Sequence, residues 1–229
     1  MRKIIGILGG MGPLATVDLF DRIVKLTPAK SDSEHLRILI DCNPAIPDRT
    51  EYIVSGAENP APALIATAQN LEKAGADFLI MPCNTAHYFY DEICRHVAIP
   101  FLHMPREVAK LLSREGVFCA GLLATVGTIR GGVYEKALSE AGIKTVHPTE
   151  GEQAEVNRVI YDGIKAGNFS IDSSGLRGVA ESLLERGAQR LILGCTELPI
   201  AFNVFQIKAP IVDATQVLAQ AAVAEALNI

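Results

Sequence analysis

The chain reads Ala76-Asp77-Phe78-Leu79-Ile80-Met81-Pro82-Cys83-Asn84-Thr85 in its first half and Ala188-Gln189-Arg190-Leu191-Ile192-Leu193-Gly194-Cys195-Thr196-Glu197 in its second. In both stretches a run of strand-forming residues leads into a short polar turn that contains a cysteine. Each cysteine is therefore expected at the carboxyl end of a buried strand, the edge at which open α/β sheets bind ligands. Two thiols at equivalent edges would face each other across one cleft, as an acid and a base on opposite sides of a carbon atom.

A second pair of stretches indicates an internal repeat. Residues 5–12 (IGILGGMG) align with residues 120–127 (AGLLATVG), so that Gly6 corresponds to Gly121. These glycines are 115 residues apart, and Cys83 and Cys195 are 112 apart. Two separate motifs with nearly the same offset predict two homologous halves.

Short runs rich in valine, isoleucine and leucine alternate with helical patterns. The runs are residues 4–8, 36–41, 78–81, 118–123 and 191–193. Helical spacing covers residues 61–74 and 174–186, each followed by a glycine as the expected helix stop. Continuous apolar strands are typical of parallel sheets with helices on both faces. The expected fold class is α/β, with pseudosymmetric three-layer α/β/α domains and mainly parallel sheets.

Residues 100–105 (PFLHMP) are the expected crossing between the halves, and residues 207–213 (IKAPIVD) are the expected crossing back, because residues 209–212 (APIV) mirror residues 99–102 (IPFL). The first domain is predicted to comprise residues 1–105 plus 208–229 and to carry Cys83. The second is predicted to comprise residues 106–207 and to carry Cys195. The last helix, residues 215–227, would then pack on the first domain.

Charge and cysteine content exclude several classes of function. The net charge of −5, without a dense Lys/Arg run, argues against a nucleic-acid or membrane partner. Five irregularly spaced cysteines form neither a disulfide framework nor a zinc motif, so no metal is expected. The first apolar run is too short for a signal peptide, and no stretch of transmembrane length follows. We expect a cytoplasmic protein with reduced thiols.

The glycine loop after the first strand, Gly10-Met11-Gly12-Pro13-Leu14-Ala15, fits the loose dinucleotide pattern G-x-G-x-x-G/A. Pro13 removes one amide that a pyrophosphate would use, and Asp41 lies farther along the chain than the usual ~20 residues. A tight turn that brings backbone amides close to a small anion is the favoured interpretation. A turn without any ligand remains an alternative.

Most unpaired cysteines are simply buried apolar residues. Cys83 and Cys195 differ because polar residues follow each of them, and a helix that starts there would lower the thiol pKa from about 8.5. This favours a function for both. Cys94 and Cys119 have no such setting and fit the core or a helix face, and Cys42 is ambiguous.

Three motifs together resemble the aspartate racemase branch of the aspartate/glutamate (Asp/Glu/hydantoin) racemase superfamily. They are residues 9–16 (GGMGPLAT), 81–87 (MPCNTAH) and 193–199 (LGCTELP). The resemblance spans essentially the whole chain and implies a cofactor-independent racemase with its active site between two pseudosymmetric domains. It also implies a homodimer. Glutamate racemases usually have Asp-Ser-Gly in the first loop and histidine at the place of Glu197, so both differences favour the aspartate branch.

The resemblance also draws attention to Arg49 and Lys165, which are 116 residues apart. In aspartate racemases an arginine and a lysine at these places bind the side-chain carboxylate of the substrate. Composition alone would make both residues solvated surface charges.

The implied reaction is inversion at Cα of aspartate without pyridoxal phosphate. One thiolate removes the Cα proton while the opposite thiol delivers one. The groups expected to hold the substrate, besides Arg49 and Lys165, are Met11, Gly12, Asn84, Thr85, Thr128, Thr196 and Glu197. A role for His87 is left open beside that of a plain helix-surface histidine, and Glu197 is equally typical of a helix start.

Several alternatives use the same residues. A related scaffold can isomerise maleate, decarboxylate arylmalonates, racemise hydantoins, or racemise glutamate or a broader range of amino acids. A catalytically inactive protein that binds small anions is another alternative. A dithiol redox protein, in which oxidation joins Cys83 and Cys195, is the third.

Overall fold

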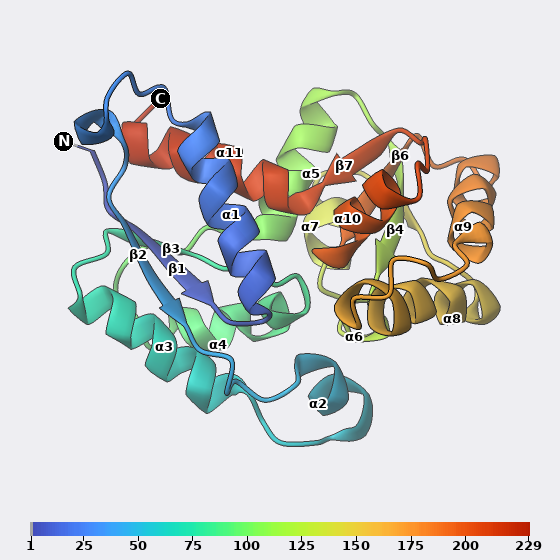
Figure 1. The fold of residues 1–229 in the computed structure, drawn as a ribbon, viewed down its shortest axis with the longest axis horizontal. Helices are drawn as coiled ribbons and strands as arrows, with labels where there is room; N and C mark the ends of the chain where they lie inside the picture. Colours follow the sequence, from blue (N-terminus) through green and yellow to red (C-terminus); the bar gives the residue numbers. More distant parts are fainter. Residues whose placement is uncertain (1) are drawn as a thin grey trace.

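Two parallel sheets form the frame of the protein (Figure 1), whose residues 2–229 are described by a computed structural model. The first sheet has the order β2-β1-β3, and the second has the order β5-β4-β6-β7. The strands of the first sheet are β1 (Ile5–Gly9), β2 (Ile38–Cys42) and β3 (Phe78–Ile80). Those of the second are β4 (Cys119–Ala124), β5 (Lys144–Val146), β6 (Arg190–Gly194) and β7 (Ile211–Asp213). The predicted α/β class with parallel sheets is confirmed.

Helices cover both faces of each sheet, which gives three layers in each half. In the first half they are α1 (Pro13–Leu26), η1 (Asp32–Glu34), α2 (Arg49–Ser55), α3 (Ala61–Lys73), η2 (Thr85–Phe89) and α4 (Tyr90–Cys94). They continue with α5 (Met104–Arg114), α6 (Val126–Arg130), α7 (Glu135–Glu140), α8 (Glu150–Arg158), the π-helix η3 (Val159–Lys165), α9 (Ser174–Glu185), α10 (Glu197–Val204) and α11 (Ala214–Leu227). The helices predicted at residues 61–74 and 174–186 are α3 and α9. Gly75 and Gly187 end them with φ of 95° and 96°, a conformation that favours glycine.

The two halves repeat each other in detail. β1 lies between β2 and β3, just as β4 lies between β5 and β6. Gly6 pairs with Leu79, and Gly121 pairs with Leu191. A Cβ atom at either glycine would come within 2.8 Å of the Cδ2 atom of its partner leucine. The repeated glycine is therefore explained by the same close approach of neighbouring strands.

The chain passes from one half to the other in the helices that follow the two predicted crossing segments, not in the segments themselves. Phe101 bridges to Leu79 beside β3, and β7 pairs with β6, so each segment stays in its own sheet. This differs at β7 from the sequence-based grouping of residues 208–229 with the first domain. After β7 the chain crosses over, and α11 packs against α1 and α5.

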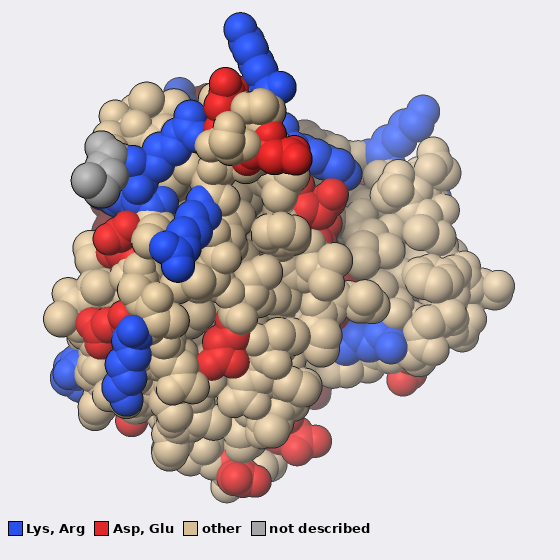
Figure 2. All heavy atoms as spheres, turned by 60° about the vertical axis from the view of Figure 1, so that its left-hand side comes forward, with Lys and Arg blue, Asp and Glu red and all other residues tan. Residues whose placement is uncertain are grey.

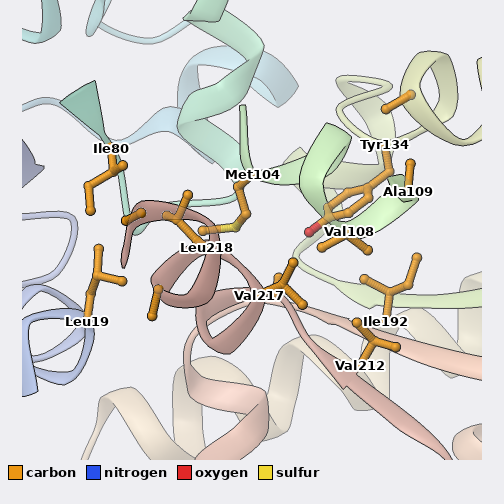
Figure 3. Packing of buried hydrophobic residues seen from close by; sticks show 14 of the residues in the cluster. Leu19, Ile80, Met104, Val108, Ala109, Tyr134, Ile192, Val212, Val217 and Leu218 are labelled. Carbon is orange, nitrogen blue, oxygen red and sulfur yellow. The ribbon is translucent and has the colours of Figure 1, made fainter. Parts of the chain in front are cut away.

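One hydrophobic cluster joins the halves (Figure 3). It contains Ile80 from the first sheet and Ile192 from the second, with Met104 of α5 and Leu218 of α11 between them. Two separate clusters cover the outer faces, one around α3 and one around α8, α9 and α10. Because the shared cluster is continuous and buried, it fixes the two sheets relative to each other.

The surface shows no sign of a single-charge patch on the face drawn in Figure 2, where basic and acidic side chains are interspersed. Within residues 2–229, none of the helices has the length and apolar character that a membrane crossing requires.

Candidate active site

A narrow cleft contains both cysteines. Cys83 follows β3 and Cys195 follows β6, and both side chains are buried. The empty volume of the cleft is about 350 Å³. Its other lining residues are Met11, Asp48, Arg49, Thr50, Asn84, Thr85, Thr125, Tyr161, Lys165, Gly194, Thr196 and Glu197. Each half thus delivers one thiol to a shared site, which is the placement that the repeat predicts.

Three threonine hydroxyls form a triangle at the side of Cys83. The Oγ1 atom of Thr85 lies 2.8 Å from that of Thr128 and 3.1 Å from that of Thr125. Thr128 is fully buried and is not among the residues that line the cleft, whereas Thr125, which sequence analysis did not select, does line it. Thr128 therefore supports the site from behind, and Thr125 stands at its surface.

Asn84 is held by a tyrosine from the other half. The hydroxyl of Tyr134, which is fully buried, donates to Oδ1 of Asn84 at 2.5 Å. Burial raises the pKa of Tyr134, with smaller contributions from Asp213 and Cys195, so this hydroxyl stays a donor. With its oxygen occupied, the Asn84 amide keeps its N–H groups for other acceptors. Nothing in the local sequence around Tyr134 signals this long-range contact.

Arg49 is the first residue of α2, where Asp48 caps the helix by accepting from the Glu51 amide at 2.9 Å. Its Nη1 donates to the carbonyl oxygens of Ile46 and Pro47. Its buried Nε has no hydrogen-bond partner among the described residues. Burial disfavours its charge, but the neighbouring Cys83 and Asp48 outweigh this, and the pKa of Arg49 is raised. An anchored guanidinium with an unused N–H group is suited to bind an anion.

Lys165 reaches the cleft from the end of η3. Its ammonium lies 4.8 Å from the ring centroid of Tyr161, and the Tyr161 hydroxyl donates to Thr50 Oγ1 at 3.4 Å. Burial lowers the pKa of Lys165, but the nearby Cys195 and Glu197 raise it more, and the result is a raised pKa. Two cations, one from each half, therefore line the same cleft as the two thiols. Tyr161 was not predicted from the sequence, because it lies in the π-helix η3 and no sequence pattern indicates a π-helix.

Cys195 is paired with a carboxylate. Its Sγ donates to Glu197 Oε2 at 2.9 Å, and the Thr196 hydroxyl donates to the same oxygen at 3.1 Å. Burial first, and then the charge of Glu197, raise the pKa of the Cys195 thiol well above its usual range, although Lys165 opposes them. Cys195 is therefore held in its thiol form.

His87 lies behind the Cys83 turn and is not among the lining residues of the cleft. Its Nδ1 is 2.8 Å from the carbonyl oxygen of Cys83, and its Nε2 accepts from the Met104 amide at 3.2 Å. Nδ1 then carries the proton and donates to the carbonyl. Burial lowers the pKa of His87 to about 4, so the ring is neutral at neutral pH. His87 is thus a buried support, and of the two alternatives left open by the sequence, the helix-surface histidine does not fit its burial.

The glycine loop forms the entrance to the cleft. Gly10 has a φ of 97°, and a Cβ there would collide with the backbone of Asn43 at 2.3 Å. Its amide donates to Thr16 Oγ1 at 2.9 Å and is therefore already used. Met11 lines the cleft, and Gly12 lines an adjoining outer chamber of about 880 Å³. The chamber shares Met11, Arg49, Lys165, Thr196 and Glu197 with the cleft.

The outer chamber has a largely apolar wall. Its apolar side chains include Leu14 of α1, Ile164 of η3 and Ile200 of α10. Within residues 2–229, no cluster of three or more His, Cys, Asp or Glu side chains is arranged to hold a metal ion.

Comparison with known proteins agrees with this architecture. The sequence pattern of the family described as Asp/Glu/Hydantoin racemase matches residues 8–222. The chain belongs to this racemase family. Family membership supports an isomerase that inverts a stereocentre, and it agrees with the resemblance carried by the three motifs.

Individual relatives include racemases of differing specificity. The chain is 32% identical over 223 residues to the broad specificity amino-acid racemase RacX of Bacillus subtilis (strain 168), covering 96% of each chain. The structure of Picrophilus torridus aspartate racemase is similar, with 33% identity and a TM-score of 0.80 over 98% of this chain and 94% of that one. A putative Asp/Glu racemase from Yersinia pestis has a TM-score of 0.86 and 29% identity, over 98% and 99% of the two chains.

Proposed function

We propose that the protein interconverts L- and D-aspartate without pyridoxal phosphate, with Cys83 and Cys195 acting on opposite faces of Cα. One observation carries the proposal: a thiol from each half lines a cleft that also contains Arg49 and Lys165. Two thiols supply a base and an acid, and two cations supply the counter-charge for a dicarboxylate.

The surroundings of the two thiols support an assignment of the proton transfers. In one direction Cys83, as thiolate, takes the Cα proton, and the thiol of Cys195 delivers its own proton to the other face. The roles reverse for the other enantiomer. The hydrogen bond to Glu197 keeps Cys195 protonated, while Arg49 offers a positive charge to Cys83. A two-base racemase needs one thiol and one thiolate, and the surroundings of Cys195 suit it to be the thiol.

The substrate carboxylates have separate partners. Amide and hydroxyl groups of Asn84, Thr85 and Thr196 would bind the α-carboxylate, where negative charge increases as the Cα proton leaves. The unused Nε–H of Arg49 and the ammonium of Lys165 would hold the distal carboxylate and orient Cα between the sulfurs. Glu197 would receive the substrate ammonium.

The test is hydrogen exchange at Cα. The purified protein is incubated in D₂O with L-aspartate and a thiol reductant, without pyridoxal phosphate, and is followed by proton NMR and chiral chromatography. D-aspartate should appear with deuterium at Cα while the remaining L-aspartate is still protiated early in the reaction, because the two protons belong to different thiols. If aspartate keeps both its Cα proton signal and its chirality, the proposal is wrong.

Single cysteine variants make the test specific. Cys83→Ala and Cys195→Ala should each lose racemisation by at least about 100-fold, the usual contribution of one acid or base. Each variant should still exchange the Cα proton of only one enantiomer, the one facing the remaining thiol. Cys94→Ala is the matched control, because Cys94 belongs to α4 and does not line the cleft. Equal exchange of both enantiomers by one variant would exclude the two-base scheme.

A broader substrate range is the second candidate. The apolar wall of the outer chamber adjoins the cleft, which gives room for a side chain longer than that of aspartate. Glutamate, leucine and maleate are therefore assayed beside aspartate. Racemisation of leucine at a rate near that of aspartate would favour a broad-specificity racemase, and formation of fumarate from maleate would favour an isomerase of that type.

We also propose a homodimer. Leu14, Val17 and Phe20 of α1 are exposed apolar side chains close to one another along one helix, and Ile200 is exposed beside the same chamber. Light scattering after size-exclusion chromatography should give twice the mass of 24.5 kDa. A monomer at micromolar concentration would contradict this proposal.

A further inference from the structure

A second cavity of about 610 Å³ lies behind the Cys83 turn and shares no lining residue with the catalytic cleft. This volume includes space open to solvent, and the part that water-sized spheres can occupy is about 190 Å³, so only a small molecule fits. Nothing in the proposed reaction uses it.

The walls of this cavity come from both halves. Tyr88 of η2 and Tyr90 of α4 belong to the first half, and Lys136 of α7 to the second. Arg106 stands near the start of α5, which joins the halves. At Gly131 a Cβ would lie 3.0 Å from Cδ2 of Tyr88, so the two halves meet closely at this point.

The charge of the cavity is positive. Arg106 and Lys136 line it, and neither forms an ion pair within residues 2–229. Arg106 lies over the ring of Tyr90, 5.5 Å from its centroid. Asp91 is the one carboxylate among the lining residues, and it is exposed, as are Arg106 and Lys136. Two cations therefore face one carboxylate around a space large enough for a ligand.

The two histidines of the cavity add no charge, and both ring nitrogens of His87 are already hydrogen-bonded. Burial, followed by the proximity of His87, Arg106 and Lys136, lowers the pKa of His103 to about 3, and that of His87 is also lowered. The His103 ring lies edge-on to the Tyr90 ring, with centroids 4.4 Å apart. The cavity thus combines fixed cations with aromatic surface, which suits an anionic group on a carbon skeleton.

We propose that this cavity is a second binding site, for a small organic anion that carries a carboxylate or a phosphate. Arg106 and Lys136 hold the anionic group, and the rings of Tyr88 and Tyr90 contact the rest of the molecule. The ligand contacts residues of both halves at once.

The site is connected to the catalytic turn by direct hydrogen bonds. His87 forms part of the cavity wall, contacts the Cys83 carbonyl at 2.8 Å and accepts from the Met104 amide at 3.2 Å. A ligand that shifts His87 or the start of α5 therefore shifts Cys83 relative to Cys195. This consequence, a change in turnover, rests on the proposed racemase function.

Calorimetric titration of the full-length protein tests binding, with inorganic phosphate and succinate as separate probes. Arg106→Gln/Lys136→Gln removes both cations of the cavity. Lys110→Gln/Arg114→Gln makes the same charge change farther along α5, where neither residue lines the cavity. Arg49→Gln removes one of the two cations of the catalytic cleft, so binding whose affinity is unchanged in this variant belongs elsewhere. Thermal unfolding of each variant checks that it is folded.

At least one probe should bind at millimolar concentration and should bind about tenfold or more weakly to Arg106→Gln/Lys136→Gln, because two charge-assisted contacts are lost. Binding should persist in Arg49→Gln and in the α5 control. Preference for phosphate indicates a phosphate ester, and preference for succinate indicates a carboxylate. Absence of binding to the wild type, or equal binding to the cavity variant, would overturn the site.

The same probe is then added to the racemisation assay. A site coupled to the Cys83 turn should change kcat, whereas occupancy of the cleft by a competitor would raise KM alone. The change in kcat should be lost in Arg106→Gln/Lys136→Gln. An unchanged kcat at saturation overturns the coupling. Failure of the protein to racemise any amino acid would count against the proposed function, while calorimetry would still decide the binding site.

Discussion

The turns that carry Cys83 and Cys195 have the same backbone placement and opposite electrostatic surroundings. Cys83 lies near the guanidinium of Arg49, and its carbonyl is held by His87. Cys195 donates to the carboxylate of Glu197, and the position that corresponds to His87 is Pro199. The repeat therefore sets where the two sulfurs lie, and the residues that differ between the halves set the electrostatic surroundings of each sulfur.

The largest effect on activity is expected from removing Arg49, the cation beside Cys83, which tests the difference in electrostatic surroundings between the two turns. Arg49→Gln should lower kcat/KM for aspartate about 1,000-fold, because it takes away both the partner of the distal carboxylate and the positive charge near Cys83. Arg49→Lys should recover part of the loss. Steady-state kinetics measure both, with the exposed Arg95→Gln as control. A loss below about tenfold would mean that Arg49 does not act on the substrate.

The strands and the cysteine turns were predictable because local patterns encode them. Continuous apolar runs gave β1, β3, β4 and β6, and glycine stops gave the ends of α3 and α9. The short edge strand β5, with the sequence Lys144-Thr145-Val146, has no such run and was not predicted. It forms because Cys119 to Gly121 of β4 offer backbone partners.

The rest of the site depends on contacts between residues far apart in the chain. Tyr134 reaches Asn84 across 50 residues, and Tyr161 reaches Thr50 across 111. Such contacts follow from how the halves pack, which no local pattern contains. Thr125 and Thr128 illustrate the same limit: Thr125 is the N-cap of α6 and Thr128 lies in its first turn, and only packing decides which of them lines the cleft.

The second test concerns His87, which only the first half possesses. In the native protein its pKa is about 4, below the reference of about 6.5, so its contribution to stability is present above pH 6.5 and is lost as the pH falls toward 4. The loss amounts to up to about 3 kcal/mol. Urea unfolding at pH 7 and pH 4.5 should show a smaller difference for His87→Gln than for the wild type. The exposed His96→Gln should behave like the wild type in this comparison.

The third test asks whether the two halves are equally constrained where they are alike. Gly6→Ala and Gly121→Ala should each lower the free energy of unfolding by about 1–3 kcal/mol, because both place Cβ 2.8 Å from a leucine methyl group. Gly178→Ala is the control, since α9 leaves open space there and alanine favours a helix. It should raise stability slightly in denaturant titrations. A tolerated alanine at either strand glycine would contradict the shared steric explanation.

The smallest expected effect comes from neutralising Glu197, and it bears most directly on the difference between the two thiols. Glu197→Gln removes a negative charge from beside Cys195, so the pKa of that thiol should fall and its thiolate should form at lower pH. Thiolate absorbance at 240 nm, recorded in the Cys83→Ala background, follows Cys195 without interference from the other catalytic thiol. Glu140→Gln, which neutralises an exposed carboxylate on α7, should leave the titration unchanged.

Glu197→Gln should also change the racemisation kinetics. Because the thiol that delivers the proton would be partly ionised in this variant, racemisation should slow less than about tenfold and its pH profile should move toward acid. An unmoved titration would mean that burial alone keeps Cys195 protonated, and the contrast between the two turns would then depend on Arg49.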